Sequence, residues 1–229
     1  MKKYLYLLFY LFLFIFSESK AQLSYGLKVG STFSSFAQAN NSLSGALGVI
    51  GGGMVDYGLT HQVTIHGNID YLQLRGALEG IPQNVDGAFV LRTSIYTMHA
   101  AEAAGLVSYR VPLPVLFSAS PAFMAGGGVT YNFFVQDKRT TKYYYQDHTA
   151  TSRGVEDVTS SFTPLLYSVQ AGLRFEFPLE EDSSLSTVVF DVRFRRNINE
   201  LLSGFSIYGN GNASDLYLNT VIFAIGFKL

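Results

Sequence analysis

Residues 216–229 alternate between two kinds of side chain. The first set is mostly large and apolar and comprises Tyr217, Asn219, Val221, Phe223, Ile225, Phe227 and Leu229. The second set is smaller or more polar toward its end and comprises Leu218, Thr220, Ile222, Ala224, Gly226 and Lys228. A β-strand places alternate side chains on opposite faces. The pattern therefore predicts a strand with one apolar face.

The same alternation recurs in seven earlier segments, at 23–36, 45–59, 62–76, 93–111, 115–136, 162–177 and 185–197. The Ala-rich centre of 93–111 also fits a helix, but its neighbours need a pairing partner, so we expect a strand there. In 115–136 we expect Phe123, Val129 and Val135 to share one face. Pro121 lies within that segment, and it predicts a bend or bulge.

The connections between these segments alternate in length. Short links lie at 60–61, 112–114 and 178–184, and longer, polar or glycine-rich stretches lie at 38–44, 77–92, 137–160 and 198–215. An up-and-down barrel with both termini in the periplasm has short turns on that side and longer loops outside. A closed sheet also leaves no unpaired edge in lipid. The sequence predicts an all-β fold, an eight-stranded antiparallel up-and-down transmembrane β-barrel over residues 22–229.

Composition indicates which face looks outward. Charged residues are 14% of the chain, against about 25% in typical soluble domains. A soluble lipocalin-like barrel would show the same alternation with its apolar set inside. Here the polar set is mainly Gly, Ser, Thr, Asn and Gln, which is poor material for a solvated surface. We expect the apolar set to face lipid and an interior set, Lys28, Arg174, Glu176, Asp191 and Arg193, to form charge pairs.

The N-terminus predicts export. Residues 1–21 begin with Lys2 and Lys3, continue with an apolar run over 4–16 and end in small and polar residues at Ser19 and Ala21. This is the pattern of a cleaved, Sec-type signal peptide, with an uncleaved N-terminal anchor as the alternative. The chain has no cysteine, which excludes lipoprotein attachment and disulfides. A net charge of −1 gives no reason to expect nucleic-acid binding.

Four stretches carry a resemblance to a known family. They are YGLKVGSTFS (25–34), GGGVTYNF (126–133), FDVRFRRNI (190–198) and the closing FAIGFKL (223–229). With these stretches the chain resembles the PorT-like outer-membrane β-barrel family of Bacteroidota. The resemblance implies an eight-stranded barrel and, for most members, no known activity.

Candidate chemistry is confined to the histidines. Barrel enzymes that trim or acylate lipids use His with Ser or an acidic residue, and the candidates are His61, His66, His99 and His148. His66 shares a face with Asp70, but four positions along a strand span about 13 Å, too far for contact. His148 stands beside Asp147 in a polar stretch. We therefore expect structural or solvated histidines and no catalytic, cofactor-binding or metal site, because no metal-ligand spacing and no nucleophile elbow occurs.

Three tyrosines at 143–145 fit either an aromatic girdle at the membrane interface or a contact surface for a partner. We expect a small outer-membrane protein without enzymatic activity, acting as an anchor or interaction protein. Its expected partners are outer-membrane lipid, the barrel-assembly machinery and a protein bound through loop 137–160. The alternatives are a lipid-modifying enzyme and a narrow pore.

Overall fold

The structure is a computed structural model, and it describes residues 23–38, 41–42, 45–85, 88–112, 119–144, 149–179, 186–205 and 214–229. The expected signal peptide over residues 1–21 lies outside the described residues.

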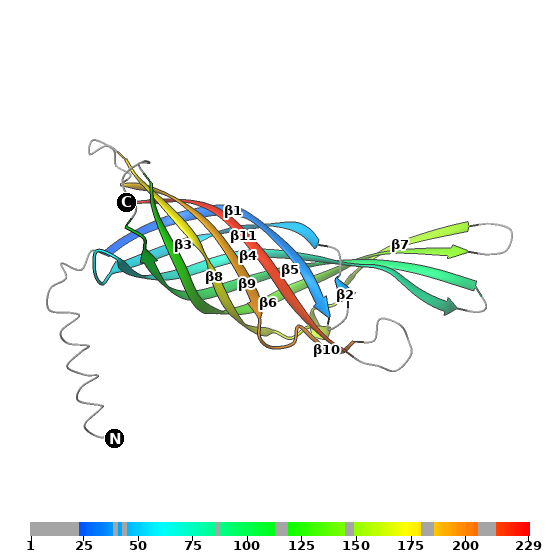
Figure 1. The fold of residues 1–229 in the computed structure, drawn as a ribbon. Helices are drawn as coiled ribbons and strands as arrows, with labels where there is room; N and C mark the ends of the chain where they lie inside the picture. The colour runs from blue at the N-terminus through cyan, green and yellow to red at the C-terminus, as the bar shows by residue number, and fades with distance from the viewer. Residues whose placement is uncertain are drawn as a thin grey trace, which may run out of the picture.

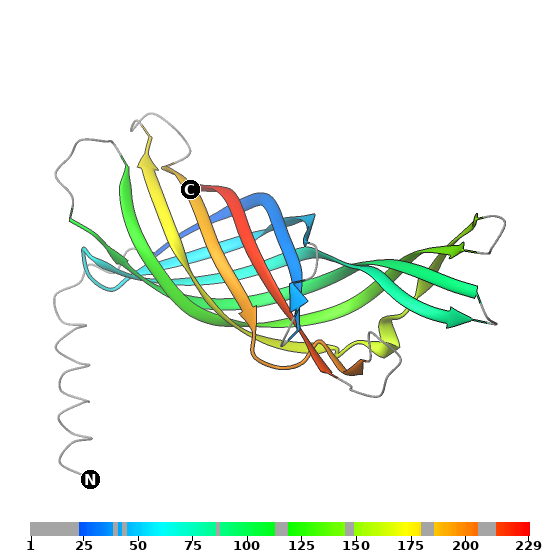
Figure 2. The same ribbon diagram turned by 45° about the vertical axis from the view of Figure 1, so that its right-hand side comes forward.

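Eight long strands form a closed antiparallel ring (Figures 1 and 2). They are β1 (Leu23–Gln38), β3 (Gly45–Gly58), β4 (Val63–Val85), β5 (Ala88–Arg110), β6 (Ser120–Tyr144), β8 (Leu165–Pro178), β9 (Thr187–Asn197) and β11 (Ser214–Lys228). Each pairs with the next along the chain, and β11 pairs with β1 from Gly26↔Lys228 to Ala37↔Tyr217. The predicted eight-stranded barrel is confirmed, including the strand in the Ala-rich segment.

Four short elements complete the chain. They are β2 (Asn41–Ser42), β7 (Thr149–Asp157), η1 (Thr159–Ser161) and β10 (Leu202–Phe205). The start of β1, the end of β11 and the tight turn between β3 and β4 lie at one end of the barrel, which we call the terminal end. In that turn the backbone N–H groups of Leu59 and Thr60 both donate to the carbonyl of Val63.

Two stretches expected to be loops are strands instead. β4 and β5 pair with each other as far as Val85↔Ala88, across the stretch expected to be a loop at 77–92. Within 137–160, β6 runs on to Tyr144 and β7 pairs back along it from Gln136↔Asp157 to Tyr144↔Thr149. The order β4-β5-β6-β7 makes a four-stranded sheet beyond the barrel wall. We call residues 77–85, 88–95, 136–144 and 149–157 the extension; it projects to the right in Figures 1 and 2.

The irregular point in β6 is not at Pro121. The pairings Pro121↔Phe175 and Ala122↔Arg110 continue without a shift, because Pro121 is only the second residue of the strand. The register between β5 and β6 shifts instead between His99 and Ala100. One extra residue moves every later side chain to the other face. Val135 is consequently buried inside, 0% exposed, and the prediction that it shares the face of Phe123 is wrong.

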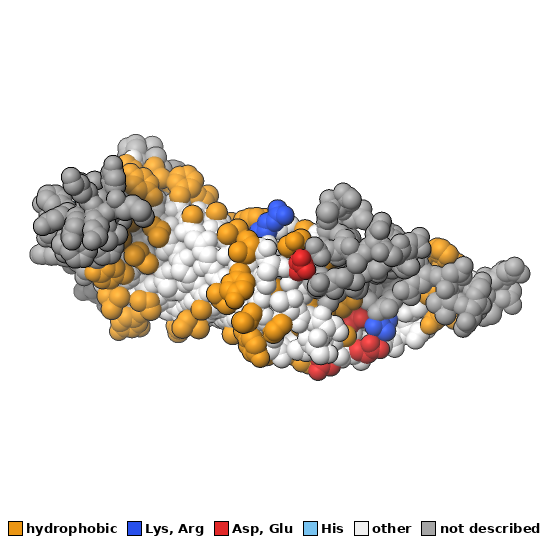
Figure 3. All heavy atoms as spheres, turned by 90° about the horizontal axis from the view of Figure 1, so that it is seen from below, with side chains coloured by type: hydrophobic (Ala, Val, Ile, Leu, Met, Phe, Trp, Pro, Cys, Tyr) orange, Lys and Arg blue, Asp and Glu red, His pale blue; other side chains and the backbone are white. Residues whose placement is uncertain are grey.

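The outward face of the barrel is apolar, as predicted. Leu27 and Ile69 are 73% and 74% exposed, and large apolar side chains from all eight long strands accompany them. Figure 3 views one face of the molecule from below and shows hydrophobic side chains spread over the barrel wall. On this face the charged side chains lie nearer the extension. A closed barrel covered with apolar side chains suits contact with hydrocarbon rather than water.

The interior has two zones. Toward the extension, apolar side chains from β1, β3, β4, β5, β6, β8, β11 and neighbouring segments fill the barrel; they are Phe36, Ile50, Leu72, Leu74, Tyr96, Met98, Ala100, Val135, Phe162, Leu166, Leu201, Leu216, Leu218, Ile222 and Ala224. Toward the terminal end the interior is polar and charged. Gly52 gives the polar zone its close packing, because a Cβ there would lie 2.2 Å from the carbonyl oxygen of Ile69.

Candidate functional site

The buried charges of the described residues balance in number. The cations are Lys28, Arg174, Arg193, Arg195 and Lys228, and the acids are Asp56, Asp70, Glu102, Asp137 and Asp191. Burying a charge in protein is costly unless a partner compensates it. The expected inward direction of Lys28, Arg174, Asp191 and Arg193 is confirmed.

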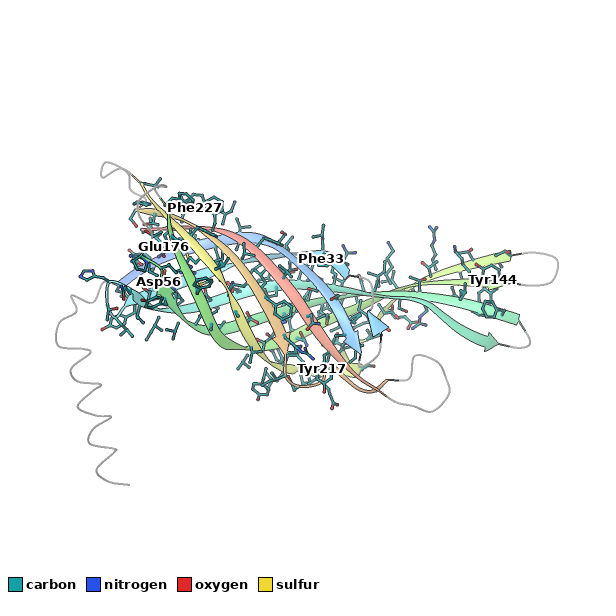
Figure 4. The ribbon with its side chains drawn as sticks, viewed as in Figure 1. Phe33, Asp56, Tyr144, Glu176, Tyr217 and Phe227 are labelled. Atoms are coloured by element: carbon teal, nitrogen blue, oxygen red, sulfur yellow. The ribbon has the colours of Figure 1, made fainter. Side chains whose placement is uncertain are left out.

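Arg174 forms the centre of the cluster near the terminal end. Its guanidinium donates two hydrogen bonds to Asp191, from Nε to Oδ1 at 2.7 Å and from Nη2 to Oδ2 at 2.9 Å. Its third nitrogen, Nη1, donates to Asp56 Oδ2 at 3.0 Å, so one side chain joins β3, β8 and β9 across the interior. Such two-point pairs combine charge with fixed geometry. Asp56 and Glu176 are labelled in this zone in Figure 4.

Lys228 extends the cluster to the barrel's last strand. Its Nζ lies 2.6 Å from Asp56 Oδ2 and also contacts Glu176 Oε1. Glu176 in turn accepts a hydrogen bond from Arg110 Nη2 at 2.7 Å. The expected interior role of Glu176 is met with partners other than those expected, because strands distant in sequence meet across the lumen.

Glu102 forms a second cluster nearer the middle of the barrel. Its carboxylate accepts hydrogen bonds from Arg195 Nε at 2.7 Å, Thr130 Oγ1 at 2.9 Å and Gln170 Nε2 at 3.0 Å. Arg195 also donates from Nη2 to Thr130 Oγ1 at 2.6 Å. These contacts join β5, β6, β8 and β9. Side-chain hydrogen bonds and ion pairs therefore link strands across the interior of the polar zone. We call this set of contacts, centred on Arg174 and Glu102, the cross-brace.

His66 lies between an acid and a hydroxyl. Its Nδ1 is 2.6 Å from Asp56 Oδ1, and its Nε2 is 2.7 Å from Ser108 Oγ. Sequence reasoning tested His66 only against Asp70 on its own strand and missed Asp56, which stands directly opposite on β3. The short turn between β3 and β4 was the available signal, because it sets which residues face each other.

A Ser–His–Asp set can activate a serine as a nucleophile when substrate reaches it. Here Ser108 is 4% exposed, and Asp56 is also held by Arg174 and Lys228. Arg174 Nη1 lies 2.7 Å from His66 Nδ1, so a guanidinium cation stands beside the imidazole that would have to accept the serine proton. A groove on the outer wall is lined by Gly53, Gly67, Gly105 and their neighbours, and Ser108 is not part of its lining. His66 is thus buried among Asp56, Ser108 and Arg174, and its structural role stays a prediction.

The other histidines are separate from this set. His61 is exposed in the turn before β4, and His99 lies on the outer wall, where its Nδ1 is 2.6 Å from the hydroxyl of Tyr71. His148 and Asp147 lie outside the described residues. In the part of the chain that the structure describes, no three His, Cys, Asp or Glu side chains are grouped to hold a metal ion. No helix there is both long and apolar enough to cross a membrane.

The extension is the second candidate site. β7 is exposed along nearly its whole length, and among the described strands it pairs with β6 alone. Tyr144, labelled toward the tip of the extension in Figure 4, stands 13 residues past Tyr131, the last β6 residue paired with β8. This position lies well beyond the part of β6 that pairs with β8, and Tyr143 lies beside it; Tyr145 is outside the described residues.

Similarity to known proteins is found at the level of structure. No protein-family profile matches the chain, and no curated protein matches it. Ail, the attachment invasion locus protein of Yersinia pestis, solved in complex with the heparin analogue sucrose octasulfate, has a TM-score of 0.40 and 13% identity over 91% of this chain and 99% of its own. Neisserial surface protein A has a TM-score of 0.36 and 10% identity over 91% of this chain and 99% of its own. The outer membrane protein OprG from Pseudomonas aeruginosa has a TM-score of 0.37 and 10% identity over 90% and 94%.

Proposed function

We propose that the chain is a small outer-membrane β-barrel protein without enzymatic activity, which anchors its extension at the cell exterior and contacts a partner there. The observation that carries the proposal is that an apolar outer wall continues into a sheet whose outermost strand, β7, is mainly polar and exposed along nearly its whole length. The wall suits hydrocarbon and the sheet suits water. Insertion would follow Sec-type export and would use the barrel-assembly machinery.

The filled interior favours an anchor over a pore. The apolar zone stands across the lumen at one end, and the charge clusters of Arg174 and Glu102 stand across it at the other. A conducting barrel needs a continuous water-filled path, as in porins with many more strands. An eight-stranded ring with these contents leaves the extension as the surface for interaction.

The proposed family is the PorT-like barrels of Bacteroidota. The residues that support it are the strand motifs at 25–34, 126–133, 190–198 and 223–229. They fall on β1, β6, β9 and β11 as wall segments. This assignment goes together with an anchoring role, since the resemblance implies no activity for most members.

A lipid-modifying enzyme is the second candidate, and the Asp56–His66–Ser108 set is the observation that favours it. We expect the lipid A of a deletion strain to be identical to that of the parent strain, because Ser108 is shielded from lipid. Mass spectrometry of extracted lipid A checks this expectation. A species lost in the deletion strain and not restored by a Ser108→Ala variant would establish the enzyme instead.

The proposed partner contact is tested by shortening the β6–β7 hairpin. Lys138 and Val155 are directly paired, so replacing residues 139–154 with Asn-Gly closes the ladder with a two-residue turn and leaves the barrel strands intact. Proteins cross-linked at the cell surface and co-purified with the full chain are expected to be absent with the shortened chain. Far-UV circular dichroism of both proteins controls for folding. The same set of proteins recovered from both chains would contradict the proposal.

A further inference from the structure

The extension has one face whose composition differs from the other. The pairings Lys138↔Val155, Thr140↔Arg153 and Tyr144↔Thr149 place alternate residues of β6 and β7 on the same side of the sheet, and Phe89↔Tyr144 adds β5. We call this side the cationic face; in β5, β6 and β7 it comprises Phe89, Leu91, Thr93, Ile95, Gln136, Lys138, Thr140, Lys142, Tyr144, Thr149, Thr151, Arg153, Val155 and Asp157.

Three positive charges gather there. Arg153 lies opposite Thr140 and therefore diagonal to both Lys138 and Lys142, and diagonal partners in an antiparallel pair are about 7–8 Å apart. All three side chains are exposed. Within the described residues none of them forms a salt bridge, whereas Arg139 on the opposite side pairs with Asp137 and Glu156. The cationic face thus presents charge that this sheet does not neutralise.

The acid on this face, Asp157, already has hydrogen-bond donors from its own chain. Asp157 lies at the barrel end of β7, where its Oδ1 accepts hydrogen bonds from the backbone N–H and the hydroxyl of Thr159, at 2.9 and 2.6 Å. These hydrogen bonds hold the pKa of the Asp157 carboxyl below its usual value. The carboxylate is directed to its own chain, and the three cations remain for an external anion.

The rest of the face suits sugar rings. Threonine hydroxyls at 140, 149 and 151 can donate to and accept from hydroxyl groups. The Phe89 and Tyr144 rings lie side by side with centroids 6.0 Å apart and a 50° tilt, and both are exposed. Aromatic rings on an exposed sheet offer flat apolar area with a polar tip on the tyrosine.

We propose that the cationic face binds an anionic polysaccharide, with Lys138, Lys142 and Arg153 on its sulfate, phosphate or carboxylate groups and Phe89 and Tyr144 against its sugar rings. Charge complementarity selects the anion, since clustered Lys and Arg attract polyanions, and Arg adds paired donors for an oxyanion. The aromatic pair and the hydroxyls favour a glycan over an acidic peptide. The inference rests on the proposed function, in which the extension lies outside the membrane.

Binding of fluorescein-labelled heparin to the purified full-length mature protein in detergent tests the proposal by fluorescence anisotropy. The triple variant Lys138→Gln, Lys142→Gln, Arg153→Gln is expected to raise Kd at least about tenfold and to lower the salt slope of log K by about three, one for each lost contact. The matched single variants are Arg153→Gln, which is expected to weaken binding, and Arg196→Gln, which removes an equal charge from β9 and is expected to leave Kd unchanged. The charge-conserving triple Lys138→Arg, Lys142→Arg, Arg153→Lys is expected to bind.

Three results would overturn the proposal. They are an unchanged Kd in the glutamine triple variant, equally tight binding of neutral dextran, and tighter binding of polyglutamate than of heparin, which would assign the face to an acidic protein segment. The measurement needs no membrane, so it is independent of the cell-surface test. Loss of heparin binding in the triple variant together with unchanged co-purifying proteins in the shortened chain would uphold the face and reject the proposed partner contact.

Discussion

Replacing Glu102 with leucine should destabilise the barrel strongly, because it leaves Arg195 buried without its counter-charge. Glu102 is 1% exposed and accepts three hydrogen bonds, from Arg195, Thr130 and Gln170. Removing one member of a buried ion pair costs about 3–5 kcal/mol. The double variant Glu102→Leu, Arg195→Leu should recover most of that loss, since an apolar pair of similar size is often neutral. Glu156→Leu, which breaks the exposed pair with Arg139, should cost about 1 kcal/mol or less.

The assay is urea unfolding of the protein in lipid vesicles, followed by far-UV circular dichroism. The free energy of unfolding is obtained by linear extrapolation for the wild type, the two single variants and the double variant. The order of stability should be wild type, then Glu156→Leu, then the double variant, with Glu102→Leu lowest. A Glu102→Leu variant within about 1 kcal/mol of the wild type would refute the cross-brace, because a surface pair costs no more than that.

Three further predictions follow from the same structure. Gly52→Ala should reduce the refolding yield in vesicles, because its Cβ would meet the Ile69 carbonyl at 2.2 Å, whereas Gly105→Ala, with no atom within 4 Å, should refold like the wild type; equal yields would contradict the packing described. The purified barrel should show no stable conductance steps in a planar bilayer, because apolar and charged side chains fill its lumen, and regular open steps would show that they do not. Thr159→Val should raise the pKa of Asp157 toward its usual value in an NMR titration, since the hydroxyl donor to the carboxylate is lost, and an unchanged pKa would remove that cause.

The barrel and the direction of its faces were predictable because apolar and polar residues alternate in the sequence with the period of two that a strand requires. β8 shows this: Tyr167 and Val169 face out while Ser168, Gln170 and Arg174 face in, as expected. Val135 shows the limit. A single register shift between His99 and Ala100 reverses the face, and no residue type in β6 announces it.

The extension was not predictable because its stretches have the composition of loops. The stretch at 77–92 contains Gly80, Pro82, Asn84 and Gly87, and 137–160 is rich in polar residues, so both had the composition of loops. In the fold, their strands continue a ladder begun in the barrel wall. Backbone pairing with a strand of the wall forms these strands, so they need no alternating pattern of apolar and polar side chains.

The Asp56–His66–Ser108 set was missed because its members are joined across strands. Along β4 the acid nearest to His66 is Asp70, which pairs with Lys28 at 2.8 Å. Asp56 faces His66 only once the β3–β4 register is fixed, and Ser108 requires the β4–β5 register as well. The sequence predicted a structural role for His66, and it gave no indication of the partners that the structure places beside it.

The direction of the apolar side chains is the central claim, and the chain offers a clean probe of it because it contains no tryptophan. Phe223→Trp places an indole on the outer wall, where Phe223 is 50% exposed, and Phe36→Trp places one in the interior, where Phe36 is 1% exposed. In vesicles made with acyl-chain-brominated lipid, the fluorescence of Trp at position 223 should be strongly quenched and that at position 36 hardly at all. Equal quenching at both positions, or stronger quenching at position 36, would contradict a barrel with its apolar face in the membrane.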